Sequence, residues 1–270
     1  MDRLEIRPAV PEDIPGICRV NRGEPGPWAH IESCTAHVLN RMKNGFYVQI
    51  AVLSGQIVGH AEWIVSDTYR GRSFYLGQLQ VEPSLQKRGV GRRMIEDGIR
   101  RARLEGCGTV TLIPEPETGS EAFYEKCGCT RGREIVCCRL PALPGETDGI
   151  RAEEAPHGIV KSLPFVFGLT QTSAEHMWQV YNRESELSGR QVDTLIGGDF
   201  CIQIGGFDRK KDAFVLAWSG GDIPGLIRTA QAFAHACGYP GAAFHFFSEY
   251  DGYFPKELTE PEGFEMYLEL

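Results

Sequence analysis

The sequence predicts an α/β protein, in which a mixed, mainly antiparallel sheet is flanked by helices and followed by a second, smaller domain of the same kind. Segments with helical and strand periodicity alternate through the first half. A segment rich in proline and glycine, residues 141–149, then interrupts the chain, and a similar order of elements follows it. The 270 residues exceed the usual single-domain length of about 100 to 150, so we expect two domains, 1–143 and 150–270.

The first domain is predicted from local signals in chain order. Residues 4–7 are expected to form a strand, and Pro11 followed by two acids opens a helix. A second helix covers residues 30–42. Two strands joined by Ser54-Gly55-Gln56 form a hairpin. Residues 89–105 combine an apolar stripe with a charged face, which predicts an amphipathic helix. The expected strands are 46–53, 57–65, 74–81, 109–113 and 134–140, and a short helix covers 120–126.

The second domain repeats the final part of this order. Cys107-Gly108 ends one predicted helix and Cys237-Gly238 another, and a strand follows each pair. The same number of residues separates Gly108 from Leu140 and Gly238 from Leu270. We therefore expect a degenerate internal duplication. Its elements are strands over 158–169, 200–204, 213–218, 242–247 and 263–270, and helices over 173–187 and 223–236.

Composition limits the classes of partner. The net charge of −8 argues against a general nucleic-acid binder, which needs a basic surface. No apolar run has the length of a signal peptide or a membrane span, so we expect a cytoplasmic protein without membrane contact. Its nine cysteines are then expected to be reduced. Cys127-Gly-Cys129 and Cys137-Cys138 have no second Cys/His pair nearby in sequence, and buried inert thiols are favoured over a metal site.

The segment from Gln86 to Arg92 carries the strongest functional signal. A predicted strand leads into Gln86-x-x-Gly89-x-Gly91, and this loop leads directly into a helix. Glycines let an anion approach the backbone, and the free N–H groups of the first helical turn attract it. Lys87, Arg88 and Arg92 add positive charge. The alternative is a solvated turn without a ligand. A dinucleotide fingerprint fits poorly, because its third glycine position holds Met94.

Combined with two other segments, this loop resembles the GNAT superfamily of acyl-CoA N-acyltransferases. Gln86, Gly89 and Gly91 match the family's Gln/Arg-x-x-Gly-x-Gly/Ala motif. The segment from Glu121 to Gly128 looks like its Phe-Tyr-Glu-Lys-x-Gly helix, and the opening from Ile6 to Asp13 is typical of it. The resemblance covers residues 1 to about 140. It implies a GNAT-like fold and acetyl-CoA as acyl donor.

The resemblance also implies roles for individual residues. Tyr124 is expected to protonate the departing thiolate, although it could simply pack beside Phe123. Where the family commonly has an asparagine before this helix, the chain has Glu117, which puts the usual contact to the pantetheine arm in doubt. The implied cofactor-binding residues are Leu79, Gln80, Val81, Gln86, Lys87, Arg88, Gly89, Val90, Gly91, Arg92 and Phe123.

The general base is less clear from the sequence. Glu62 lies on a predicted strand and is the candidate, but a solvated carboxylate and a water relay are alternatives. Gln78 and Gln80 are expected to face the substrate and cannot accept a proton at neutral pH.

The expected function is transfer of an acetyl group from acetyl-CoA to a primary amine, on a small molecule or a peptide, by direct attack in a ternary complex. Alternatives are a non-catalytic acyl-CoA-binding regulatory module and an interaction scaffold. In the second domain, Asp222 stands where the loop would be, so that copy is expected to lack a cofactor and to shape the substrate cleft or an oligomer interface. A homodimer remains open.

Overall fold

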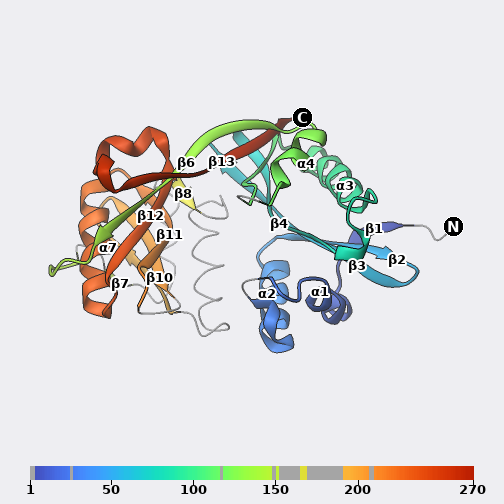
Figure 1. The fold of residues 1–270 in the computed structure, drawn as a ribbon, viewed down its shortest axis with the longest axis horizontal. Coiled ribbons are helices and arrows are strands. Elements are labelled where there is room, and N and C mark those ends of the chain that lie inside the picture. The colour runs from blue at the N-terminus through green and yellow to red at the C-terminus, as the bar shows by residue number, and fades with distance from the viewer. Residues whose placement is uncertain are drawn as a thin grey trace. The chain divides into compact units, whose positions relative to one another are not determined.

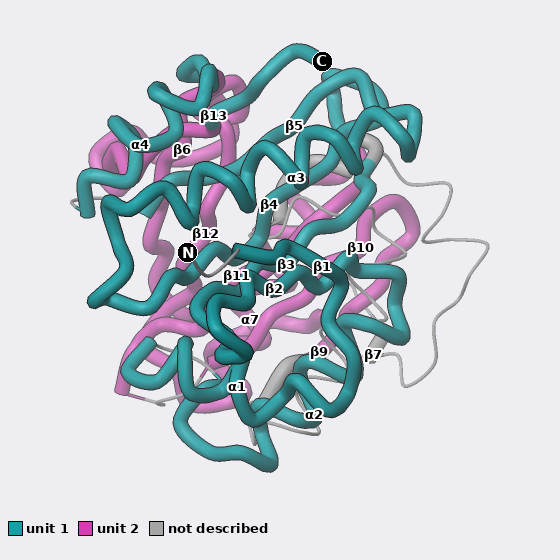
Figure 2. Tube along the Cα trace, turned by 90° about the vertical axis from the view of Figure 1, so that its right-hand side faces the viewer, with its two compact units in different colours: residues 1–131, 266–270 teal, residues 132–265 magenta. Residues whose placement is uncertain are grey.

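The computed structural model describes residues 4–24, 27–115, 118–147, 150–151, 165–168, 191–206 and 210–270. They form two compact units (Figure 2). The first contains Met1–Arg131 together with Met266–Leu270, and the second contains Gly132–Glu265. The predicted helix over 173–187, most of the strand over 158–169 and Glu117 lie outside the described residues.

The first unit is built on one sheet. Neighbouring strands are antiparallel except β4 and β5, which are parallel. The last strand in this order comes from the C-terminus, where Met266–Glu269 pair with β5. The strands, in spatial order, are β1 (Glu5–Pro8), β2 (Tyr47–Leu53), β3 (Gln56–Thr68), β4 (Gly71–Val81), β5 (Thr109–Leu112) and the end of β13 (Thr259–Glu269).

Helices cover this sheet on both faces (Figure 1). One face carries α1 and α2, and the other carries α3. Helix α3 buries the predicted apolar stripe, with Val90, Met94, Ile95 and Ala102 inside. The hairpin turn between β2 and β3 uses Ser54 and Gly55, both with positive φ. The helices are α1 (Ile14–Val20), α2 (Ile31–Lys43), α3 (Val90–Leu104) and α4 (Ser120–Lys126).

The second unit repeats this plan. Its strands β11 and β12 are parallel and flank helix α7 (Ile223–Cys237) in the chain, as β4 and β5 flank α3. The strands β9 and β10 add to β11 in antiparallel order. Strand β9 was missed from the sequence. The strands are β6 (Thr130–Pro141), β7 (Ile150–Arg151), β8 (Phe165–Gly168), β9 (Gln191–Ile196), β10 (Phe200–Gly206), β11 (Ala213–Gly220) and β12 (Gly241–Phe247).

The two halves of the chain exchange their last strands. Strand β6 ends the first half but pairs with β12 of the second unit, and the end of β13 closes the chain but pairs with β5 of the first. Each of these pairings is antiparallel and occupies the same place in its sheet. The compact units differ from the predicted domains 1–143 and 150–270, and the roles assigned to these two domains stay predictions.

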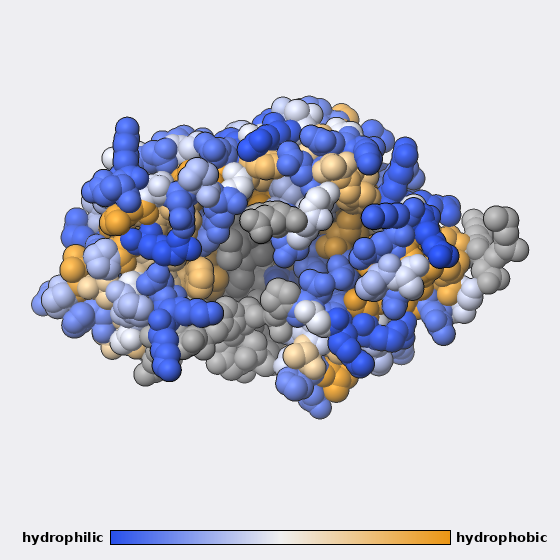
Figure 3. Space-filling model, in the orientation of Figure 1, coloured by the Kyte–Doolittle hydropathy of each residue, from blue (hydrophilic) through white to orange (hydrophobic). Residues whose placement is uncertain are grey.

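The predicted fold class, a mixed and mainly antiparallel sheet with flanking helices, is confirmed. On the face in Figure 3 the surface is mostly hydrophilic, and hydrophobic residues form small separate patches. Among the described residues, the helices are too short or too polar to cross a bilayer.

Helix α3 packs closely against β3 in the first unit's core. Gly98 of α3 lies over Trp63, and a Cβ at Gly98 would come 2.3 Å from Trp63 Cζ2. Trp63 cannot easily move, because its Nε1 donates to Gln49 Oε1 at 3.2 Å and its ring stacks on Phe74 at 5.3 Å. Only glycine fits at this point of the helix.

We predict that Gly98→Ala destabilises the protein, although alanine favours a helix by up to about 1 kcal/mol. Forcing a methyl group into this packed contact is expected to cost about 1 to 3 kcal/mol. The urea midpoint of unfolding should fall. Gly108→Ala is the control, because its Cβ meets no atom within 4 Å. A Gly98→Ala midpoint equal to or above that of the wild type would contradict the packing described here.

Candidate active site

The strands β4 and β5 part in the middle of the first unit's sheet. Their parallel register runs from Ser73 opposite Thr109 to Leu76 opposite Leu112 and stops there. Beyond Leu76, β4 continues to Val81 paired with β3. Backbone groups of β4 on the side of β5 thus become available to another partner, as the predicted role of Leu79, Gln80 and Val81 requires.

A cavity of about 250 Å³ opens where the strands part. Residues of β4, residues of the segment after β5 and Tyr124 of α4 all line it. Glu24, which follows α1 in the chain, lines the cavity and accepts a hydrogen bond from Gln80 Nε2 at 2.8 Å. The full lining is Glu24, Leu76, Gly77, Gln78, Leu79, Gln80, Ile113, Glu115, Ser120 and Tyr124.

A bulge in β4 shapes this wall. Trp63 pairs with Leu76 and Glu62 pairs with Gln78, so Gly77 is the extra residue. Bulges of this kind re-aim side chains and increase twist, and they often lie next to active sites. Gln78 and Gln80 both line the cavity, as the sequence predicted for this strand.

The predicted anion loop is an exposed turn that ends at the start of α3. Lys87 and Gly89 have φ of 60° and 85°, and Gly89 is the residue before the first helical turn. No acidic side chain lies in that turn, and no side chain caps it. Space is open around Gly89, where an added Cβ would meet nothing within 4 Å. Gln86 Nε2 donates to Val81 O at 3.2 Å and so ties the loop to the end of β4.

Gly91 and Phe123 bring α3 and α4 together. A Cβ at Gly91 would lie 3.3 Å from Phe123 Cζ, so the second glycine of the loop permits this close approach. Phe123 contacts Tyr124 edge-on, with ring centroids 5.0 Å apart. The loop, Phe123 and Tyr124 therefore form one continuous structure from the start of α3 to the cavity.

Tyr124 is a buried phenol. Burial raises its pKa well above the usual value, and nearby Cys129, Cys127 and Glu115 act in the same direction. The hydroxyl group is therefore protonated at neutral pH, and Tyr124 is one of the residues that line the cavity.

Glu62 lies behind the cavity wall, in a buried polar cluster. His37 Nε2 is 2.9 Å from Glu62 Oε1, Arg41 Nε is 3.3 Å from Oε2, and His60 Nε2 is 3.5 Å from Oε1. Burial acts to raise the pKa of Glu62, but His37, Arg41 and His60 outweigh it and lower the pKa to about 2. Glu62 is thus a buried, ionised and paired carboxylate, and its role as base stays a prediction.

The cluster reaches the cavity through two amides. Gln78 Nε2 donates to Asn21 Oδ1 at 3.4 Å, and Asn21 Nδ2 lies 3.1 Å from His60 Nδ1. Because the Asn21 amide is the donor, His60 accepts at Nδ1 and carries its proton on Nε2, which faces Glu62. Glu62 is therefore connected to the cavity lining through His60, Asn21 and Gln78.

Sequence reasoning missed Glu24, Glu115 and Ser120 of the cavity lining. Each lies in a loop or at a helix start, where no periodicity or motif marks it. Only the fold brings them to the end of β4.

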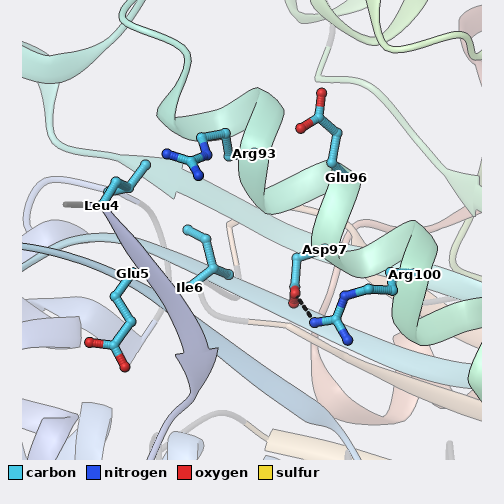
Figure 4. Close-up of a pocket in the computed structure, with 7 residues that line it drawn as sticks. All are labelled: Leu4, Glu5, Ile6, Arg93, Glu96, Asp97 and Arg100. Atoms are coloured by element: carbon cyan, nitrogen blue, oxygen red, sulfur yellow. Dashed lines mark hydrogen bonds and ion pairs between the residues drawn. The ribbon is translucent and has the colours of Figure 1, made fainter.

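A second cavity, of about 660 Å³, lies between β1 and α3 (Figure 4). Its lining is charged, and Asp97 points toward Arg100 to form an ion pair. Asp97 also accepts from Tyr47 Oη at 2.9 Å and from Gln49 Nε2 at 2.7 Å, so its carboxylate is committed to the fold. The lining of this cavity includes none of the predicted site residues, and β1 is remote from Tyr124 in the sheet order.

In the second unit, helix α7 corresponds to α3, and a side chain caps its first turn. Asp222 precedes α7, and its Oδ1 accepts a hydrogen bond from Gly225 N at 2.9 Å. The carboxylate occupies the position that an anion would take. The contrast with the uncapped start at Gly89 is direct.

The buried His60 predicts a pH dependence of stability. Burial lowers its pKa from 6.5 to about 4, against the attraction of Glu62. Between these values the unfolded chain binds a proton that the folded protein does not, so acidification from pH 6.5 to about 4 should cost on the order of 2 to 3 kcal/mol. We expect His60→Gln to lose less stability in this window than the wild type, as measured by urea unfolding. Exposed His30→Gln is the control, and equal pH slopes in all three proteins would contradict the prediction.

Comparisons with known proteins agree with this geometry. Residues 13–129 match the family described as acetyltransferase (GNAT) family. A search of curated protein sequences finds no match. Among solved structures, a GCN5-related N-acetyltransferase from Anabaena variabilis has a TM-score of 0.69 at 11% identity, covering 98% of this chain and 72% of that one. One from Kribbella flavida gives 0.63 at 15%, covering 100% and 71%.

A tandem GNAT protein from the clavulanic acid biosynthesis pathway has a TM-score of 0.61 at 13% identity, covering 99% of this chain and 98% of that one. At these identities the structures establish the fold. Residues 13–129, which are less than half of the chain, match the GNAT acetyltransferase family.

Proposed function

We propose that the protein transfers an acetyl group from acetyl-CoA to a primary amine, by direct attack within a ternary complex. One observation carries the proposal: the uncapped start of α3 leads, through Gly91, Phe123 and Tyr124, to a cavity where two strands part. An anion-binding element, an exposed strand edge and a proton donor then lie in the order in which a diphosphate, a pantetheine arm and a thioester follow one another in acetyl-CoA.

The residues present fit the diphosphate. Space is open at Gly89, and the first turn of α3 lacks acids. Lys87, Arg88 and Arg92 are exposed, and Arg92 Nε lies 3.1 Å from Glu96 Oε1. Free N–H groups at the start of a helix bind phosphate, and the start of α3 provides such groups. The exposed backbone of β4 from Leu79 to Val81 would take the polar groups of the pantetheine arm.

The cavity suits a small amine or the end of a longer one. Its volume of about 250 Å³ is below the roughly 300 to 1,000 Å³ of pockets for drug-sized ligands. Glu24 and Glu115 give it two carboxylates, which attract a protonated amine before reaction.

The chemistry follows from these positions. The neutral amine attacks the thioester carbonyl, a C–N bond forms and the C–S bond breaks. The leaving thiolate takes the Tyr124 hydroxyl proton. The proton that the amine loses passes through water, either toward Glu62 behind the cavity wall or back to the Tyr124 phenolate, which restores the acid. Backbone N–H groups near Val81 would stabilise the negative charge that develops on the carbonyl oxygen.

The second unit is not expected to bind acyl-CoA, which leaves one acyl-CoA site per chain. Asp222 already satisfies the start of α7, and its negative charge would repel a diphosphate. We propose that this unit contributes to substrate binding or to assembly.

Gly89→Glu is predicted to abolish acetyl-CoA binding. The substitution places a carboxylate at the start of α3, where the diphosphate would sit. Gly106→Glu is a matched control, because Gly106 also has a left-handed φ, 70° against 85°, and also faces open space, but lies beyond the other end of α3. Isothermal titration calorimetry with acetyl-CoA should show loss in Gly89→Glu only. Retained binding in that variant would remove the basis for the proposed function.

Tyr124→Phe is predicted to lower kcat by about 100-fold or more, with little change in the affinity for acetyl-CoA. The phenyl ring preserves packing beside Phe123 and removes only the proton donor. Exposed Tyr253→Phe is the control. Thiol release from acetyl-CoA with a panel of amines is the measurement. A protein that binds acetyl-CoA but releases no thiol with any amine would instead be a regulatory module, and an unchanged kcat in Tyr124→Phe would exclude its role as acid.

A further inference from the structure

Three side chains of metal-ligand type meet in the second unit, away from the acetyl-transfer site. They are Cys137 of β6, His245 of β12 and Glu262 of β13. One ligand atom from each lies within 4.8 Å of the other two. Tetrahedral zinc, with bonds of about 2.0 to 2.3 Å, holds its ligand atoms about 3.4 to 3.6 Å apart, so small side-chain rotations suffice to complete the site.

The backbone fixes two of these ligands. Cys137 and His245 are directly opposite in the antiparallel pairing of β6 and β12. Opposite residues in such a pair project from the same face with their Cβ atoms about 4.5 to 5.5 Å apart. Their proximity is therefore a property of the sheet register and does not depend on a particular rotamer.

His245 has a ring nitrogen without a hydrogen-bond partner. Its Nδ1 pairs with Glu262 Oε2, while its buried Nε2 has no partner among the described residues. Buried polar atoms are normally satisfied, and an exception calls for an explanation. The ring is also held in place, because Phe214 stacks on it at 5.9 Å. A metal ion bound at Nε2 would satisfy the nitrogen that lacks a partner, and one bound at Nδ1 would replace its contact with Glu262 Oε2.

Nearby charge does not oppose a cation. Arg139 follows Cys137 on the same face of β6, but its guanidinium pairs with Glu260 and lies 3.9 Å from Asp212. Two carboxylates thus offset one positive charge. Cys137 and His245 are buried, whereas Glu262 is exposed, so the cluster opens to solvent on one side. That opening provides an entry path for an ion and room for a water ligand.

We propose that Cys137, His245 and Glu262 bind a zinc ion, with water as the fourth ligand. A sulfur, a nitrogen and an oxygen donor form a ligand set that zinc accepts and that magnesium and calcium disfavour. The ion joins three strands, β6, β12 and β13, at one point. It therefore fixes the strand β13, whose last residues complete the sheet of the first unit.

The test uses the full chain, stripped of metal with a chelator. Zinc is titrated in competition with a chromophoric chelator, and cobalt(II) is used as a spectroscopic probe. We expect one tight site per chain and a thiolate-to-cobalt charge-transfer band. Cys137→Ser should abolish the band and weaken zinc binding by more than the roughly 10- to 100-fold that loss of an outer partner costs. Cys138→Ser is the matched control, because the next residue on β6 projects to the opposite face and should leave both readouts unchanged.

Glu262→Gln tests whether a loss of zinc binding could result from misfolding alone. Glu262 is exposed, so this variant should fold normally and retain the charge-transfer band, while zinc affinity falls. Absence of a tight site in the wild type would overturn the proposal. So would a band that persists in Cys137→Ser, or equal losses in Cys137→Ser and Cys138→Ser. These outcomes are independent of acetyl-CoA binding and therefore leave the proposed transferase function untouched.

Discussion

The parting of β4 and β5 after the pair Leu76 and Leu112 is the feature on which the site depends. A parallel pair that stayed closed would bury the backbone of Leu79 to Val81 in a ladder and leave no cavity. Because the strands separate, β4 keeps one edge paired with β3 and presents the other. The roles proposed for the start of α3, the bulge at Gly77 and Tyr124 all depend on this opening.

The exchange of last strands explains how the sheet stays intact although β4 and β5 separate. A strand with one free edge and a short paired segment is weakly held, and β5 has only four residues. The end of β13 pairs along all four of them, from Leu112 to Thr109. In the second unit β6 supports β12 in the same way. Each half thus depends on the other for the strand that braces its central element, which is why the first compact unit combines two separate stretches of chain.

The sequence was sufficient wherever the signal was local. The helix α4 was predicted with its observed ends, and the predicted start of α3 differs by one residue, because glycine and the amphipathic stripe mark it. Signals that depend on distant partners were not accessible. Glu62 reads as a solvated strand carboxylate until His37, Arg41 and His60 converge on it, and the metal-type cluster at Cys137 needs ligands from three strands. Strand register and packing determine such contacts, so local sequence patterns cannot predict them.

The two copies of the fold share the same arrangement of sheet and helix but differ in the chemistry available at one helix start. Helices α3 and α7 follow corresponding strands, and each precedes the strand that runs parallel to its predecessor. At α3 the residue before the helix is Gly89, which leaves the first N–H groups free. At α7 it is Asp222, whose carboxylate bonds to Gly225 N and adds a negative charge. One residue at a helix start therefore distinguishes an end that can receive a diphosphate from one that is internally satisfied, while the sheet, the parallel strand pair and the helix remain the same.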